Sequence, residues 1–153
     1  MTFELINEPS MKAKIVRNIL EALPDWFAIK EAREAYITES SKQICIGAME
    51  DAEYVGFLCL KETGKDTLEL AVMGVMKQYH RKGIGREMFI MAKNIARKKG
   101  YSFLQVKTVQ MGKYKDYDNT NKFYISLGFK EFEVFPTLWD EANPCQIYVM
   151  SVE

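Results

Sequence analysis

The pattern of hydrophobic and polar positions predicts alternating strands and helices along the chain. Runs of alternating or continuous apolar residues predict strands over residues 2–6, 42–49, 54–60, 68–75, 103–109, 129–135 and 146–152. Apolar residues three or four apart predict helices over residues 9–23, 29–36 and 84–99, and a short helix from residue 118 or 119 to 128. A loop over residues 136–144 is expected to carry Trp139. This order predicts an α/β protein whose neighbouring hairpins favour a mixed sheet.

The composition is that of a globular chain with no strong net charge. A length of 153 residues, 48% of them hydrophobic, fits one domain over residues 1–153 with a core of its own. Lys and Arg together number 21, as do Asp and Glu, so net charge gives no support for a nucleic-acid partner. No apolar run predicts a membrane span, and the first residues lack the layout of a signal peptide.

Three cysteines lie far apart in strand-like runs, at Cys45, Cys59 and Cys145. Their spacing matches no metal-ligand pattern, and no metal site is expected. Buried, reduced thiols in a cytoplasmic protein are the expectation, with a disulfide or a zinc site as the less favoured alternative.

A glycine-containing loop between strand 68–75 and helix 84–99 is the strongest candidate for chemistry. It runs Gln-Tyr-His-Arg-Lys-Gly-Ile-Gly over residues 78–85. Gly83 and Gly85 let backbone N–H groups approach a phosphate, the helix N-terminus adds partial positive charge, and basic side chains reinforce it. The loop lacks the third glycine of the dinucleotide fingerprint and the Lys-Ser/Thr of a P-loop. On its own, it is equally compatible with a phosphate site and with a plain structural turn.

Two further motifs lie on either side of this loop. Gly74 interrupts the strand before it, which indicates a bulge or a close backbone approach. Residues 123–129 read Phe-Tyr-Ile-Ser-Leu-Gly-Phe. With residues 80–85, these motifs resemble the GNAT superfamily of acyl-CoA-dependent N-acyltransferases, over nearly the whole chain. The chain departs from the family pattern at His80, where Gln or Arg is usual, and at Tyr117, where an asparagine is often found.

The resemblance implies a fold, a cosubstrate and a set of contacts. The fold would be a GNAT-like, mostly antiparallel sheet of six or seven strands with about four helices and a splayed central strand pair. Acetyl-CoA would be the cosubstrate, with its pyrophosphate on the loop amides and its pantetheine arm beside strand 68–75. The expected cofactor-binding residues are Met73, Val75, Arg81, Lys82, Gly83, Ile84, Gly85, Arg86 and Asn119.

Two residues are candidates for the catalytic chemistry of acyl transfer to an amine. Tyr124 matches the family's tyrosine near the cofactor sulfur, and a phenol suits protonation of the departing thiolate. The alternative is a core tyrosine that packs on Phe129. Glu69, a lone carboxylate in an apolar strand, is the candidate base, either directly or through an ordered water. Its alternative is a solvent-facing strand residue. His80 is expected to be structural because it belongs to the phosphate loop.

The acceptor site is expected to be aromatic. Trp26 and Phe27 lie between the first two predicted helices, where the family often builds a substrate wall. Trp139 and the loop over residues 114–118 would supply the opposite wall. Aromatic faces and nearby acidic residues suit a cationic amine. Each of these residues is equally well explained as a hydrophobic anchor for a loop.

The sequence therefore favours an acetyl-CoA-dependent N-acetyltransferase that acts by direct attack on a small-molecule or peptide amine. Two alternatives remain: a non-catalytic acyl-CoA-binding sensor, and a nucleotide- or RNA-binding domain, which the balanced charge disfavours. No membrane partner is expected, and a homodimer through the closing strands is compatible with the pattern.

Overall fold

The computed structural model describes residues 1–153, which form two compact units. The first comprises Met1–Lys61 and Ala71–Ile95, and the second comprises Glu62–Leu70 and Ala96–Glu153. A single domain over residues 1–153 stays a prediction. The elements in order are β1 (Thr2–Ile6), α1 (Pro9–Glu21), α2 (Lys30–Ser40), β2 (Ile44–Glu50), β3 (Glu53–Gly64), β4 (Thr67–Val75), the 3-10 turn η1 (Lys77–Tyr79), α3 (Ile84–Lys98), β5 (Phe103–Val109), α4 (Lys115–Ser126), β6 (Lys130–Asp140) and β7 (Asn143–Ser151).

The strands form the mixed sheet that was expected. Seven strands are hydrogen-bonded in the order β1-β2-β3-β4-β5-β7-β6. The pairs β1–β2, β2–β3, β5–β7 and β6–β7 are antiparallel, whereas β4 pairs with β5 in parallel, through Thr67–Glu69 and Phe103–Gln105. With the helices α1 to α4, this arrangement confirms the predicted α/β class and its mostly antiparallel sheet.

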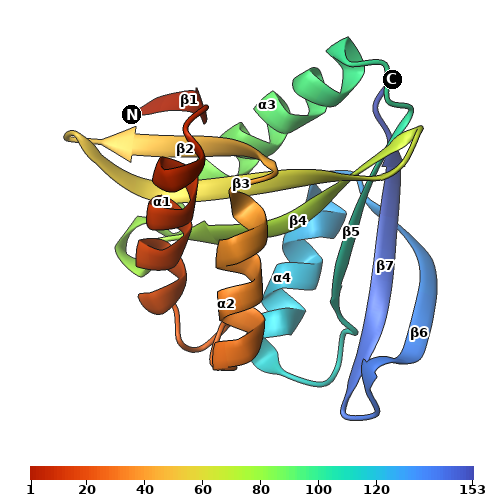
Figure 1. The fold of residues 1–153 in the computed structure, drawn as a ribbon. Coiled ribbons are helices and arrows are strands. Elements are labelled where there is room, and N and C mark those ends of the chain that lie inside the picture. The colour runs from red at the N-terminus through yellow and green to blue at the C-terminus, as the bar shows by residue number, and fades with distance from the viewer. The chain divides into compact units, whose positions relative to one another are not determined.

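In the first unit, helices cover both faces of the sheet. Helix α1 lies beside α2 and buries one apolar face that includes Ile19 (Figure 1). A Cβ on Gly74 would lie 3.0 Å from atoms of Ile19 and Phe57, so only glycine lets β4 approach α1 this closely. The neighbouring Gly56 faces the other way, since a Cβ there would meet Ile84 and Met88 of α3. Of the two alternatives that the sequence offered for Gly74, a bulge or a close approach, the packing against Ile19 and Phe57 favours the close approach.

In the second unit, α4 packs against β5, and a buried polar network joins it to the sheet. Asn121 is fully buried, and its Nδ2 donates to the carbonyl oxygens of Val109 at 2.8 Å and Tyr117 at 2.7 Å. Its Oδ1 accepts a hydrogen bond from the Tyr148 hydroxyl at 2.6 Å. Because every polar group of the amide has a partner, Asn121 fixes α4 to β5 and β7 at little desolvation cost.

Two predicted elements near the candidate site have different bounds in the structure. Helix α4 begins at Lys115, whereas the sequence predicted its start at residue 118 or 119. Asp118, one of the two residues at which the helix was expected to begin, lies inside it and accepts the Gly112 N–H at 2.6 Å. The helix over residues 29–36 also continues, to Ser40, because Ile37 adds a further buried position.

The loop expected over residues 136–144 is largely strand, and this prediction was wrong. β6 continues to Asp140, and β7 begins at Asn143, so Trp139 lies on a strand. Pro136 suggested a loop because it has no N–H to donate, but β6 is an edge strand, where proline is tolerated. The hairpin turn is closed by the Asp140 carboxylate, which accepts the Asn143 N–H at 2.9 Å.

None of the helices combines the length and the hydropathy needed to cross a bilayer.

Candidate active site

The glycine loop has the backbone geometry of an anion cradle. Arg81 and Gly83 have positive φ angles of 63° and 78°, whereas Lys82 between them is not among the residues with positive φ. A change in the sign of φ from residue to residue turns successive N–H groups towards one side, the arrangement called a nest. Helix α3 begins directly afterwards at Ile84, and its first N–H groups have no partner within the helix. These residues fit a diphosphate group.

His80 anchors this loop to the end of β4. Its Nε2 lies 2.6 Å from the Val75 carbonyl oxygen, and since a carbonyl only accepts, Nε2 carries the proton and donates. The edge of the His80 ring meets the Trp26 ring, with centroids 5.5 Å apart. Both contacts support the structural role expected for His80. They also place Trp26, an expected acceptor residue, beside the loop.

The last residues of β4 alternate in burial along the strand. Val72 and Gly74 are buried, whereas Met73 and Val75 are half-buried. Successive strand residues point to opposite faces, so Met73 and Val75 share the less covered face. The pantetheine arm is expected to run beside the backbone of these two residues.

Phe27 and Trp26 are half-buried against the core of the first unit. The Phe27 ring meets Tyr36 edge-on at 6.0 Å, and its carbonyl oxygen accepts a hydrogen bond from Arg33. The contacts hold both aromatic side chains in place. An acceptor wall and a loop anchor require the same contacts, so both interpretations stay open.

In the second unit, Tyr124 is held by aromatic packing. It is 7% exposed, and its ring meets Phe129 edge-on at 5.8 Å and Tyr148 at 6.4 Å. The contact with Phe129 expected of a core tyrosine is therefore present. A fixed ring also pre-orients the hydroxyl, so this packing is compatible with a catalytic phenol.

Glu69 is buried, which rules out the solvent-facing alternative. Only 7% of its side chain is exposed, and Oε1 accepts a hydrogen bond from Lys107 Nζ at 2.8 Å. This ion pair between β4 and β5 was not predicted. The Cys145 thiol on β7 lies within electrostatic reach of both groups. Burial raises the pKa of Cys145, more than Lys107 lowers it, so this cysteine is held as a neutral thiol and is a poor nucleophile.

The ion pair predicts a stability effect for Lys107→Met. Removing the ammonium leaves a buried carboxylate unpaired, which we expect to lower the free energy of unfolding by about 2–3 kcal/mol. Glu69→Gln in the same chain should recover most of that loss. Lys122→Met, at an exposed position on α4, is the control and should change stability by less than about 0.5 kcal/mol. Urea unfolding measures all four proteins, and an unchanged Lys107→Met would contradict a stabilising pair.

The asparagines near Tyr124 differ in their surroundings. Asn119 is exposed on α4, whereas the side-chain amide of Asn121 is buried and uses its hydrogen-bonding groups in the network described above. Tyr117, at the position where relatives often carry asparagine, is half-buried, and burial raises its pKa. Asn119 therefore stays the candidate for a cofactor contact.

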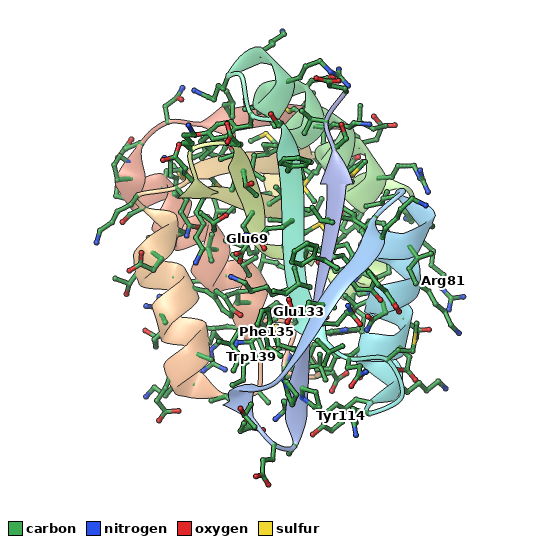
Figure 2. All side chains as sticks on the ribbon, turned by 90° about the vertical axis from the view of Figure 1, so that its right-hand side faces the viewer. Glu69, Arg81, Tyr114, Glu133, Phe135 and Trp139 are labelled. Atoms are coloured by element: carbon green, nitrogen blue, oxygen red, sulfur yellow. The ribbon has the colours of Figure 1, made fainter.

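Trp139 lies on β6 with two other large side chains that the sequence did not single out. Glu133, Phe135 and Trp139 follow one another along this strand (Figure 2). Phe135 pairs with Cys145, and Glu133 with Ile147, on β7. Trp139 is 45% exposed. No group of three or more His, Cys, Asp or Glu side chains is arranged to hold a metal ion.

Comparison with known proteins identifies the family. Residues 13–129 match the model of the acetyltransferase (GNAT) family, which covers more than half of the chain. The chain belongs to that family. Members transfer an acetyl group from acetyl-CoA, so the protein is an acyltransferase with acetyl-CoA as its cosubstrate. No curated protein matches the chain.

Solved structures share the fold. A protein of the GNAT family from Desulfovibrio desulfuricans superposes with a TM-score of 0.87 at 20% identity, over 99% of both chains. An aminoglycoside 6'-N-acetyltransferase complexed with coenzyme A gives a TM-score of 0.78 at 17% identity, over 100% of this chain and 98% of that one. The ribosomal-protein-S18-alanine N-acetyltransferase of Escherichia coli gives 0.75 at 15% identity, over 99% and 95%. At these identities the likeness concerns the fold alone.

Proposed function

We propose that the protein is an N-acetyltransferase that transfers the acetyl group of acetyl-CoA directly to a primary amine. The observation that carries this proposal is the alternating backbone at Arg81, Lys82 and Gly83, followed at once by the N-terminus of α3. Amides turned to one side at a helix N-terminus suit the pyrophosphate of coenzyme A. Ile84, Gly85 and Arg86 complete this contact.

The bound cosubstrate supplies an activated thioester, and the chain would supply the groups that act on it. The Met73 N–H, at the end of β4, would donate to the thioester carbonyl as negative charge develops there. Val75 would hold the pantetheine arm, and Asn119 would contact the cosubstrate. Tyr124 would give its phenolic proton to the departing thiolate.

Glu69 would accept the proton of the amine through an ordered water. One of its oxygens already accepts a hydrogen bond from Lys107 at 2.8 Å, which fixes the carboxylate in one orientation. The other oxygen then remains to orient a water molecule. The same ion pair favours the second candidate function, a non-catalytic acyl-CoA sensor, since a carboxylate engaged in an ion pair also serves structure alone.

The acceptor would be a cationic small molecule or a peptide amine. Trp26 and Phe27 are half-buried and Trp139 is 45% exposed, and the aromatic face of each attracts a cation. We place the protein in the cytoplasm, which three buried cysteines without a disulfide support.

Release of free thiol from acetyl-CoA tests this function. We expect an amine from a panel of polyamines, amino acids, aminoglycosides and peptides to raise thiol release well above the amine-free rate. Glu69→Gln should lower turnover by about 100-fold, the scale of a general base, while coenzyme A affinity changes by no more than a few fold. Coenzyme A binding by calorimetry without thiol release for any amine would favour the sensor.

A further inference from the structure

Two of the three cysteines face each other across neighbouring strands of the first unit. Strands β2 and β3 run side by side (Figure 1), and their antiparallel register sets Cys45 directly opposite Cys59. A hydrogen bond joins the two thiols. Opposite residues of an antiparallel pair have Cα atoms about 4.5 or 5.5 Å apart, and a disulfide spans both of these distances. The two strands therefore already hold the cysteines at a separation that a disulfide bridges.

We propose that Cys45 and Cys59 are a redox modification site, at which hydrogen peroxide converts the two thiols into an intramolecular disulfide. The Cys45 thiolate attacks one peroxide oxygen, becomes a sulfenic acid and releases hydroxide. The Cys59 thiol then attacks the oxidised sulfur, which forms the S–S bond and releases water. In total the two thiols lose two hydrogen atoms, and one peroxide is reduced to two molecules of water. This chemistry is independent of acetyl transfer.

The surroundings of the two thiols assign them different roles. The hydrogen bond from Cys59 lowers the pKa of Cys45, and the Lys12 ammonium lowers it further. Lys12 is held beside the start of β2, because its Nζ donates to the Gln43 carbonyl oxygen at 2.7 Å. The same thiol–thiol bond, together with burial, raises the pKa of Cys59. Cys45 is therefore the thiol that meets the peroxide, and Cys59 keeps its proton until it attacks the sulfenic acid.

Burial restricts the oxidant to a small molecule. Both cysteine side chains are fully covered and belong to the core cluster that α1 packs against. A bulky oxidant such as glutathione disulfide is too large to reach them in the folded chain, whereas hydrogen peroxide is little larger than water. Cys45 also pairs with Ile6, the last residue of the edge strand β1. Since the ends of short edge strands open readily, β1 provides the route of entry.

Peptide mapping after peroxide treatment tests this site. Trypsin leaves Cys45 and Cys59 together in the peptide of residues 43–61, and Cys145 in the peptide of residues 131–153. The native chain is treated with hydrogen peroxide, then unfolded and alkylated. We expect the first peptide to lack alkyl groups and to be lighter by two hydrogen atoms, and dithiothreitol to reverse both changes.

Cys145 is an internal control within the same chain. It is also fully buried, but it lies opposite no other cysteine, and burial raises its pKa. We expect it to take an alkyl group after the treatment, and to be oxidised at least roughly tenfold more slowly than the pair.

Single serine variants separate the roles of the two thiols. In Cys59→Ser, oxidation of Cys45 should stop at the sulfenic acid, which dimedone labels. In Cys45→Ser, oxidation of Cys59 should be as slow as that of Cys145. Cys145→Ser should form the cross-link as the wild type does. Circular dichroism before treatment should show that every variant is folded.

Three results would overturn the proposal. The first is a folded wild-type chain in which both thiols of the pair are still alkylated after peroxide treatment. The second is a cross-link that forms only when the chain is unfolded in urea before the treatment. The third is oxidation of Cys145 at the same rate as the pair, because position opposite a second thiol would then confer no reactivity.

Discussion

Replacing Tyr124 with phenylalanine is expected to lower kcat about 100-fold, the usual contribution of a general acid. The substitution removes only the hydroxyl, and the ring keeps its contacts with Phe129 and Tyr148. The thiolate must then leave without a proton, whereas contacts that bind coenzyme A are untouched. We therefore expect the loss in kcat, measured by thiol release with the best acceptor, and a coenzyme A affinity within a few fold of the wild type.

Tyr148→Phe is the matched control for a buried phenol. Its hydroxyl donates to Asn121 Oδ1, so removing it should cost about 1–2 kcal/mol of stability through the unsatisfied amide. It lies in the same aromatic cluster but has no proposed part in the chemistry, and its kcat should match the wild type. Equal losses of kcat in the two variants would mean that the Tyr124 hydroxyl supports the structure of the aromatic cluster and does not donate the proton. Unchanged turnover in Tyr124→Phe would remove its role as the proton donor.

Features encoded by neighbouring residues were predictable from the sequence. The strand that ends at Val75, the loop around Gly83 and the helix from Ile84 follow one another directly, so local pattern and glycine chemistry define them. Gly74 was recognised as a bulge or a site of close approach because it is a glycine inside an otherwise apolar strand. The mixed sheet followed from the order of elements and not from local pattern, whereas the parallel pairing of β4 with β5 was not predicted.

Features that depend on strand register were not predictable. Gln105 and Lys107 are polar residues two positions apart on β5, with Val106 between them, a pattern that is typical of an exposed strand face. Nothing in the local sequence indicates that a buried carboxylate lies opposite Lys107. Cys145 lies near the same pair only because β7 adds beside β5. The length of β6 was not predicted because a proline usually ends a strand. Pro136 does not end β6, because β6 lies at the edge of the sheet, where a residue without an N–H donor is tolerated.

Gly83→Val is expected to weaken coenzyme A binding roughly tenfold by calorimetry. Gly83 has a φ of 78°, and a branched side chain there costs about 1–2 kcal/mol, although a Cβ would meet no atom within 4 Å. The free loop can relax to relieve that strain. Coenzyme A binding must return the loop to its strained conformation, and each 1.4 kcal/mol of that strain lowers the affinity by a factor of about ten. The effect on the ligand thus comes from backbone conformation and not from a clash.

Gly100→Val tests that reasoning, because Gly100 shares every relevant property except its place. Its φ is 87°, and its Cβ would also meet nothing within 4 Å, but it follows the C-terminal end of α3, whereas Gly83 precedes the N-terminal end. Gly100→Val should lose about 1–2 kcal/mol of stability, since it places a branched residue in the left-handed region, whereas Gly83→Val should lose less because its free loop relaxes. Only Gly83→Val should lose coenzyme A affinity. If both variants bind coenzyme A as tightly as the wild type does, the amides of residues 81–85 do not hold the pyrophosphate. If both variants bind coenzyme A equally weakly, the loss of affinity reflects lower stability and not the conformation of this loop.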